Sequence, residues 1–300
     1  MSLKNVCCIE IGGTSAAVAI ANTLGSFLWK KKGISTAYPM SPEQAVKNIC
    51  DEIKSSYFDF DVVSIASFGP LDLKNGSIGS TTKKNWVQFP LIHEFKKNLG
   101  SKIPIILESD VTAPAFSEYL ALRQTDSDTQ AVGYLTIGTG VGLGVCINGK
   151  TFHGRDYPEF GHISLRPHPE DKFTGSCTFH NNCIEGMISS GAIAKRLGIQ
   201  PDDIRHLKAK DRIWDLFAYY IASASSTAAM CYSLDHIVVG GGIITADGRK
   251  FLYNKANSYC TDMMNGYYRV PKIVPPKYMK DAGLVGAAAV GLHPELFVKS

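Results

Sequence analysis

The chain has 300 residues, of which 45% are hydrophobic and 19% charged, and its formal net charge is +4. This composition is that of an ordinary globular protein, and the charge is too small to require a nucleic acid or a membrane surface as partner. No apolar run is long enough to span a bilayer. The eight cysteines are scattered rather than framed as in a small secreted domain, so we expect a cytoplasmic protein with reduced thiols.

A strand, a glycine turn and a returning strand open the chain. The strands are predicted at Val6–Ile11 and Ala17–Ile20. Because no helix follows the glycines directly, neither a P-loop nor a Rossmann fingerprint fits. Glycines let backbone amides approach a phosphate closely, and Glu10 could hold Mg²⁺ through water. A plain hairpin is the alternative. The residues expected to contact a nucleotide here are Gly12, Gly13 and Thr14.

Alternating helices and strands follow this hairpin. Ser41 is a predicted N-cap and Pro42 a first-turn residue of a helix that ends near Ser55. A polar loop then carries Lys83 and Lys84, which we expect to be solvated surface. The other predicted elements are a strand at Val62–Ala66, a tight loop at Ser67–Asp72, the loop Ser80–Trp86, a strand at Ile103–Leu107 and a helix at Ala115–Leu122 that starts from Thr112 and Pro114.

The opening pattern is repeated in the middle of the chain. A strand at Gly133–Ile137 enters a second glycine turn, a strand returns, and Asn148-Gly149 is a hairpin signal. Two such copies indicate a duplicated fold, in which each copy would offer amides to one end of a triphosphate; two chance hairpins are the alternative. The second set of expected nucleotide contacts is Gly138, Thr139 and Gly140.

A compact group of histidines and cysteines follows. Short spacing of this kind lets a knuckle place soft and borderline ligands on one tetrahedral ion, which suits zinc best. Four protein ligands leave no open position, so the metal would be structural and would hold the loop that carries Glu159 and Glu185. A buried thiol pair beside satisfied histidines is the alternative. The expected ligands are His162, Cys177, His180 and Cys183.

The last third of the chain is again predicted to alternate between helices and strands. A third glycine turn follows a buried strand at Ile237–Gly240 and would suit close approach by a flat ligand such as adenine; its members are Gly240, Gly241 and Gly242. The predicted helices are Ser190–Leu197 with a stop at Gly198, the apolar helix Ile213–Met230, and the small-residue helix Asp281–Val290.

In this order, these motifs resemble the ROK family of sugar kinases over nearly the whole chain. Glu10-x-Gly-Gly-Thr14 is similar to its first phosphate motif, Gly138-Thr-Gly-Val-Gly142 to its second, and Glu159-Phe-Gly-His162 with the knuckle to its sugar-and-zinc signature. Within the family the chain looks most like bacterial fructokinases. The resemblance places Asp110 as the catalytic aspartate. It implies substrate contacts from Gly69, Pro70, Ser109, Asp110, Glu159, His162 and Glu185.

The resemblance also implies an α/β fold of the actin-like, ribonuclease-H-like kind, duplicated into two domains with a central cleft for ATP and sugar. The expected domains are residues 1–112 with 281–300, and the larger 113–280 with the zinc knuckle. A homodimer is expected. ATP, Mg²⁺ and Zn²⁺ are the implied cofactors, and a hexose, most readily fructose, is the implied substrate.

Several positions depart from the family pattern. Ser15 stands where a lysine is usual after Gly-Gly-Thr, and this removes a charge near the phosphates. Thr178 and Asn181 replace the usual proline and glycine of the knuckle.

The resemblance leaves other functions open. Glucose, mannose or an N-acetylated hexosamine are alternative substrates. A non-catalytic, sugar-binding regulator is a remote alternative function. The family's repressors carry a helix-turn-helix ahead of the first strand, for which a strand starting near residue 6 leaves no room.

Overall fold

The computed structural model describes residues 5–81 and 83–297, so Thr82 of the expected polar loop lies outside the described residues. The chain falls into two compact units. The first comprises Met1–Ser117, Lys150–Tyr157 and Asp281–Ser300, and the second Glu118–Gly149 and Pro158–Lys280. The boundaries expected at residues 112 and 281 do not include the short segment Lys150–Tyr157, which groups with the first unit.

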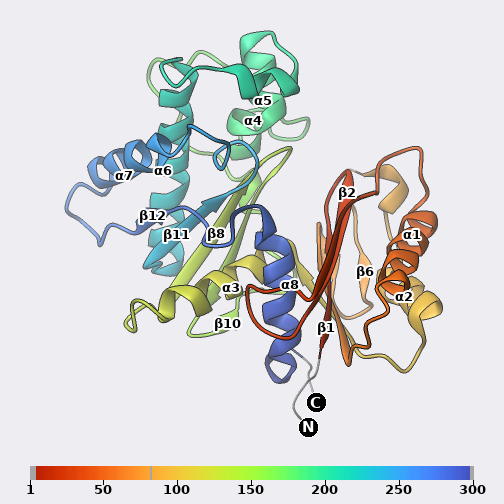
Figure 1. Ribbon diagram of the computed structural model, residues 1–300. Helices are drawn as coiled ribbons and strands as arrows, with labels where there is room; N and C mark the ends of the chain where they lie inside the picture. Colours follow the sequence, from red (N-terminus) through yellow and green to blue (C-terminus); the bar gives the residue numbers. More distant parts are fainter. Residues whose placement is uncertain (1–4, 82, 298–300) are drawn as a thin grey trace. The chain divides into compact units, whose positions relative to one another are not determined.

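The first unit is built on a five-stranded sheet in the order β3-β2-β1-β4-β7 (Figure 1). β2 pairs antiparallel with β1 and β3, whereas β4 pairs parallel with β1 and β7. β4 is buried throughout, as expected for a strand with helices on both faces of its sheet. The strands are β1 (Val6–Ile11), β2 (Ser15–Ala21), β3 (Trp29–Ser35), β4 (Val62–Ser67) and β7 (Ile105–Ser109), with a small hairpin of β5 (Leu71–Asp72) and β6 (Ser77–Ile78).

Helices α1 and α2 cover one face of this sheet and α8 covers the other (Figure 1). The predicted cap of α1 is confirmed, because the Ser41 hydroxyl accepts a hydrogen bond from Gln44 N. α8 packs closely on β1: a Cβ on Gly283 would lie 2.3 Å from the carboxyl group of Glu10. The helices of this unit are α1 (Pro42–Ser55), α2 (Leu91–Leu99), α8 (Ala282–Leu292) and the start of α3 (Thr112–Arg123), with short 3-10 turns at Lys84–Trp86, Met279–Asp281 and Pro294–Leu296.

The second unit repeats the strand pattern of the first. Its strands run in the order β9-β8-β11-β12; the two-residue strand β10 at the edge of this sheet belongs to the segment Lys150–Tyr157, which groups with the first unit. β8 and β9 are antiparallel like β1 and β2, and β11 pairs parallel with β8 and β12 as β4 does with β1 and β7. The bounds are β8 (Ala131–Ile137), β9 (Val141–Ile147), β10 (Lys150–Thr151), β11 (His236–Gly240) and β12 (Lys272–Val274).

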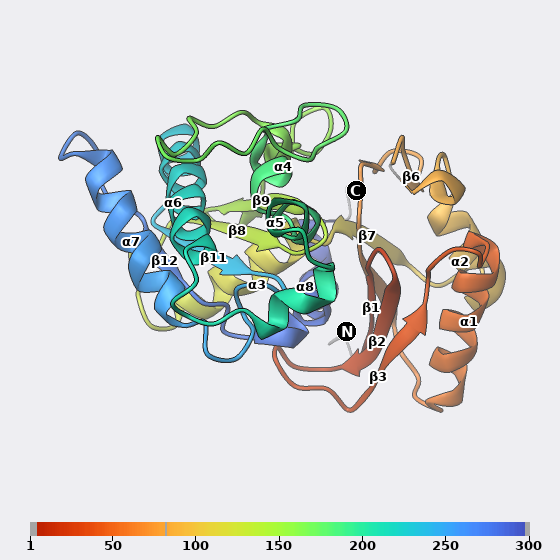
Figure 2. The same ribbon diagram turned by 90° about the horizontal axis from the view of Figure 1, so that it is seen from above.

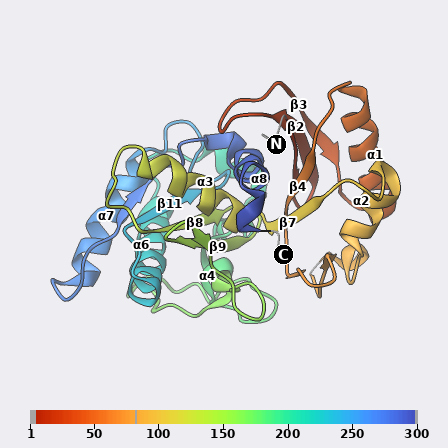
Figure 3. The same ribbon diagram turned by 90° about the horizontal axis from the view of Figure 1, so that it is seen from below.

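α6 and α7 lie side by side against this second sheet (Figure 2), and α4 lies beside α6 on the same face (Figure 3). Trp214 and Phe217 of α6 are buried in the core that these helices share with the strands. The remaining bounds are α4 (Ile184–Ile188), α5 (Ser190–Leu197), α6 (Ile213–Tyr232) and α7 (Phe251–Met264), with 3-10 turns at Phe160–His162 and Pro201–His206.

The two sheets confirm the expected actin-like duplication, since each begins with a strand–glycine turn–strand and adds parallel strands on one side. Each unit also has a hydrophobic core of its own. Within the described residues, no helix is both long and apolar enough to cross a membrane.

Candidate active site and metal centre

The carboxyl ends of β1, β4 and β7 meet at one edge of the first sheet, and expected site residues follow each end. Gly12 N donates to Ser15 O over 2.9 Å and closes the first glycine turn, whose Gly13 and Thr14 are exposed. Asp110 follows β7, and its N donates to Ser67 O of β4 over 2.9 Å. Ligands of open α/β sheets bind outside this strand edge, so the turn and Asp110 are placed where a ligand is expected.

Two carboxylates lie near each other at this edge. Burial raises the pKa of Glu10 to about 7; Lys32 opposes the shift, and the negative charges of Asp110 and Asp281 add to it. A carboxylate that is costly to ionise, close to a second one, gains from a nearby cation. The pair therefore fits the expected magnesium ion, for which oxygen ligands are preferred.

The predicted sugar contact Ser109 has a structural role. Its hydroxyl donates to Thr112 Oγ1 over 2.8 Å and accepts from Thr112 N over 3.0 Å, so Ser109 caps the first turn of α3. The side chain is buried. Ser109 therefore already satisfies an amide at the start of α3, a role that Asp110 could otherwise have had as a helix cap.

The loop after β4 holds the other expected sugar contacts of the first unit. The peptide bond between Gly69 and Pro70 is cis, and both residues are partly buried. Gly79 N donates to Pro70 O over 2.7 Å, and Phe68 N donates to Ile11 O over 3.1 Å. The loop is thus tied at both ends, which gives it a fixed path beside the end of β1.

Lys83 lies beside the expected site, which the sequence pattern did not indicate. The Lys83-Lys84 pair was expected to be solvated, which is correct for Lys84 but wrong for Lys83. Lys83 Nζ lies 3.1 Å from the centroid of the Phe68 ring and reaches the first glycine turn at Gly13. Burial lowers the pKa of Lys83 to about 8, and Asp110 opposes the shift. A lysine beside another lysine carries no signal of such burial in the sequence.

In the second unit, the second glycine turn is held from two sides. Gly138 N donates to Gly140 O over 2.9 Å, and Ser190 N at the start of α5 donates to Gly138 O over 2.8 Å. Glu185 Oε2 accepts a hydrogen bond from Val141 N over 3.1 Å. The expected nucleotide contact Thr139, at the tip of the turn, is exposed.

Two of the three glycines in the third glycine turn are required sterically, because a side chain would collide with its surroundings. A Cβ on Gly240 would lie 2.3 Å from Tyr134 Oη, and one on Gly241, whose φ is +94°, would lie 2.2 Å from Ile137 O. Only Gly242 faces open space within 4 Å. Of the three expected nucleotide contacts, Gly242 therefore presents the most accessible backbone.

The four predicted zinc ligands converge. Their ligand atoms all lie within 4.8 Å of one another. Cys177 Sγ and Cys183 Sγ each lie 3.7 Å from His162 Nδ1, and Cys177 Sγ lies 3.9 Å from His180 Nδ1. Tetrahedral zinc with bonds of about 2.3 Å to sulfur and about 2.1 Å to nitrogen places neighbouring ligands about 3.6 Å apart. The two thiols and two imidazoles therefore fit zinc in both chemistry and spacing.

The backbone of the knuckle explains one departure from the family pattern. Cys177 N and Asn181 N each donate to the other residue's carbonyl, over 3.1 and 3.0 Å. This tight turn puts Asn181 at a φ of +52°, where glycine is the least strained residue and asparagine is tolerated. Asn181 can therefore replace the usual glycine. A Cβ on Gly175 would lie 2.0 Å from Asn181 O, so that position needs glycine.

Glu159 lies in the same unit as the expected metal ligands and Glu185. Burial raises the pKa of Glu159; His162 lowers it, and Glu185 raises it. Gly161 passes so close to β9 that a Cβ would lie 1.9 Å from Val141 O. This close approach brings Glu159, His162 and Glu185 to the end of the second glycine turn, as expected for a group that shares one ligand.

A family model for ROK matches residues 6–293 of this chain. The chain belongs to the ROK family. The fructokinase of Streptococcus mutans is 32% identical to it over 273 residues, which cover 88% of each chain. The fructokinase of Zymomonas mobilis is also 32% identical, over 303 residues that cover 96% of each chain. The solved ROK family glucokinase of Streptomyces griseus, in complex with glucose and AMPPNP, has a TM-score of 0.76 at 23% identity and covers 96% of this chain and 99% of that chain.

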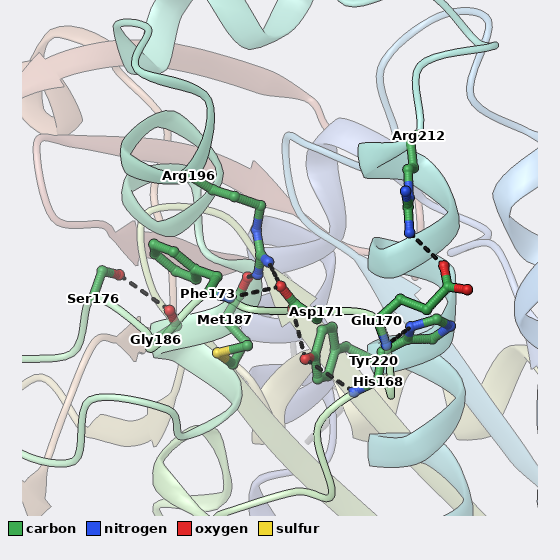
Figure 4. A network of polar contacts seen from close by, with 10 residues as sticks. All are labelled: His168, Glu170, Asp171, Phe173, Ser176, Gly186, Met187, Arg196, Arg212 and Tyr220. Carbon is green, nitrogen blue, oxygen red and sulfur yellow. Dashed lines mark hydrogen bonds and ion pairs between the residues drawn. The ribbon is translucent and has the colours of Figure 1, made fainter.

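In this ROK protein, a network of side chains anchors the irregular segment between His162 and Cys177 (Figure 4). Arg196 of α5 forms a buried ion pair with Asp171, donates to Met187 O over 3.0 Å and stacks on the Phe173 ring at 4.3 Å. Tyr220 of α6 donates to Asp171 Oδ2 over 2.8 Å. Two helices therefore hold the segment that ends at the expected metal ligands.

A second contact missed from the sequence lies in the first unit. The Tyr157 hydroxyl donates to Glu108 Oε1, and Ser109 N donates to the same oxygen over 2.8 Å. Burial raises the pKa of Glu108, and burial with the Glu108 charge also raises the pKa of the Tyr157 hydroxyl. Tyr157 therefore ties the segment Lys150–Tyr157 to the end of β7, immediately before Asp110.

Proposed function

We propose that the protein transfers the γ-phosphoryl group of ATP to a hexose, and that fructose, giving fructose 6-phosphate, is the first candidate. The observation that carries the proposal is the sheet edge at which Asp110 follows β7, beside the exposed glycine turn Gly13-Thr14 and the carboxyl of Glu10. A proton acceptor, backbone amides of a glycine turn and a place for a divalent ion are what phosphoryl transfer requires.

Each group has a role in the proposed reaction. A sugar hydroxyl is a poor nucleophile, so Asp110 would accept its proton during in-line attack on the γ-phosphorus. The amides of the glycine turns would stabilise negative charge on the phosphoryl oxygens, and Mg²⁺ would neutralise the rest. Glu159, His162 and Glu185 would hydrogen-bond the ring hydroxyls and orient the sugar.

The proposed zinc has no catalytic part in this scheme. Its four ligands fill the coordination sphere, so it would fix the backbone that carries Glu159 and Glu185 rather than activate water. The site suits that task, since the ligands come from both sides of the long segment between His162 and Cys177.

The choice of sugar is the finer part of the proposal. Two fructokinases at 32% identity over nearly the whole chain support fructose, and the glucokinase of similar fold supports glucose as the second candidate. ADP release should be measured with fructose, glucose, mannose, glucosamine and N-acetylmannosamine. We expect the highest kcat/KM for fructose. A higher value for glucose would reverse the order of the candidates, and no sugar-dependent ADP release would refute the kinase proposal.

A further inference from the structure

The first glycine turn is approached by a charged side chain from a distant part of the first unit. The positions of Lys83 Cε and Nζ are both 3.0 Å from the place that a Cβ on Gly13 would take. The end of Lys83 therefore lies directly against the exposed backbone of the turn. Lys84, the next residue, is exposed.

Lys83 is held in this place by an aromatic ring. Its Nζ lies 3.1 Å from the centroid of the Phe68 ring, and Phe68 is itself fixed by the bond from its N to Ile11 O. Phe68 also stacks edge-on against buried Trp86, with the ring centroids 5.5 Å apart. A cation over an aromatic face is attracted by the ring, so the Phe68 ring helps to position the ammonium group of Lys83.

The electrostatic surroundings favour an anion at this point. Burial lowers the pKa of Lys83 to about 8, while the carboxylate of Asp110 raises it. A partly desolvated ammonium is stabilised by any anion that comes close to it. The segment Gly12–Ser15 has no cationic side chain of its own, and Lys32 on β3 forms an ion pair with Asp281 over 2.6 Å.

We propose that Lys83 binds the terminal phosphoryl group of a nucleoside triphosphate at the Gly12–Thr14 turn, supplying the positive charge that this turn lacks. The inference rests on the proposed kinase function and deepens it by naming a phosphoryl-binding residue. Backbone amides of the turn would contact the same group, in the manner of an anion-binding nest. The alternative is that Lys83 only packs against Phe68.

Binding measured without turnover distinguishes these roles. Calorimetric Kd values for AMP, ADP and AMPPNP with Mg²⁺ should be compared for the parent, Lys83→Met, Lys83→Arg and the matched control Lys84→Met. Methionine keeps most of the apolar stem over the ring but removes the charge. We expect Lys83→Met to weaken AMPPNP binding by about 10- to 100-fold, the usual effect of losing a charged hydrogen bond, and to leave AMP binding unchanged.

The other variants make the result decisive. Lys83→Arg keeps the charge and should stay within a few-fold of the parent, and Lys84→Met should match the parent. Parental AMPPNP affinity in Lys83→Met, or equal losses for AMP and AMPPNP, would overturn the inference. If thermal melting shows that Lys83→Met does not fold, Lys83→Gln takes its place in the same comparison. A parent that phosphorylates sugar while Lys83→Met binds AMPPNP normally would refute only this inference, whereas a parent that binds no nucleotide would refute the proposed function as well.

Discussion

Glu185 Oε2 accepts a hydrogen bond from Val141 N over 3.1 Å, and Glu185 stands two positions after the metal-ligand candidate Cys183. The amide belongs to the first residue of β9, immediately after the second glycine turn. A Cβ on Gly140 would lie only 2.9 Å from the same carboxylate oxygen. Glu185 therefore connects the knuckle to the second glycine turn. Loss of a metal ion from the knuckle should disturb the structure of both.

The knuckle should hold one zinc ion per chain. Cys183→Ser removes a soft ligand from the set of four, so we expect loss of zinc, a lower melting temperature and weaker sugar binding. Each kcal/mol of lost stability should lower Tm by about 2–4 °C in a domain of this size. Metal analysis and thermal melting check this, with Cys231→Ser as control because Cys231 is exposed and outside the cluster. If the purified parent protein contained no zinc, or if the two variants had equal Tm values, the assignment would be contradicted.

Asp110→Asn should leave the fold intact and nearly abolish turnover. The two side chains are almost equal in size, but the amide cannot accept the proton, and loss of a general base lowers the rate by about 10²- to 10⁴-fold. Sugar binding should fall much less than kcat. Ser109→Ala is the structural control: it removes the α3 cap and should cost about 0.5–2 kcal/mol of stability. Activity of Asp110→Asn within a few-fold of the parent would direct the search for the base to Asp72 or Glu159.

Much of this fold was predictable because local patterns and burial agreed. The strand bounds of β1 and the helix α1 follow directly from an apolar run before a glycine pair and from a Ser-Pro start. The convergence of the four expected zinc ligands was predictable because their types and spacing are specific, and the structure brings all four together.

Two of the elements that were not predicted from the sequence have weak patterns. β3 carries three consecutive lysines and is mostly exposed, as an edge strand can be, so no alternation marks it. α7 has polar residues on much of its surface and no cap from a side chain. Lys83 and the pair formed by Tyr157 and Glu108 depend on contacts across 15 or more residues, and a single sequence does not encode those contacts visibly.

The ion pair of Arg196 with Asp171 should be important for stability. The two side chains are 10% and 3% exposed, so Arg196→Met leaves a buried carboxylate without its cation, which typically costs about 3–5 kcal/mol. Arg212→Met is a matched control, because its pair with Glu170 is 69% exposed on both sides and should contribute about 0–1 kcal/mol. Urea unfolding of both variants gives the comparison; Figure 4 draws both ion pairs. Equal losses would show that the network does not anchor the segment.

Stability should also depend on pH through Glu118 of α3. Its buried carboxylate accepts from Lys277 N over 3.1 Å, yet burial raises the pKa of Glu118 from 4.5 to about 7. Between these two values the folded state binds more protons than the unfolded state, so the free energy of unfolding falls as the pH rises through this window.

Glu118→Gln keeps an acceptor for Lys277 N but cannot ionise, so it should remove this part of the pH dependence. Glu10, whose pKa is also raised to about 7, titrates in parent and variant alike and cancels in their difference. From pH 5 to pH 8, the free energy of unfolding of the parent should therefore fall by about 2 kcal/mol more than that of the variant. Urea unfolding at intervals across this range measures the difference. Parallel curves would mean that Glu118 is ionised at little cost in the folded protein, and a steeper fall in the variant would reverse the sign of the predicted shift.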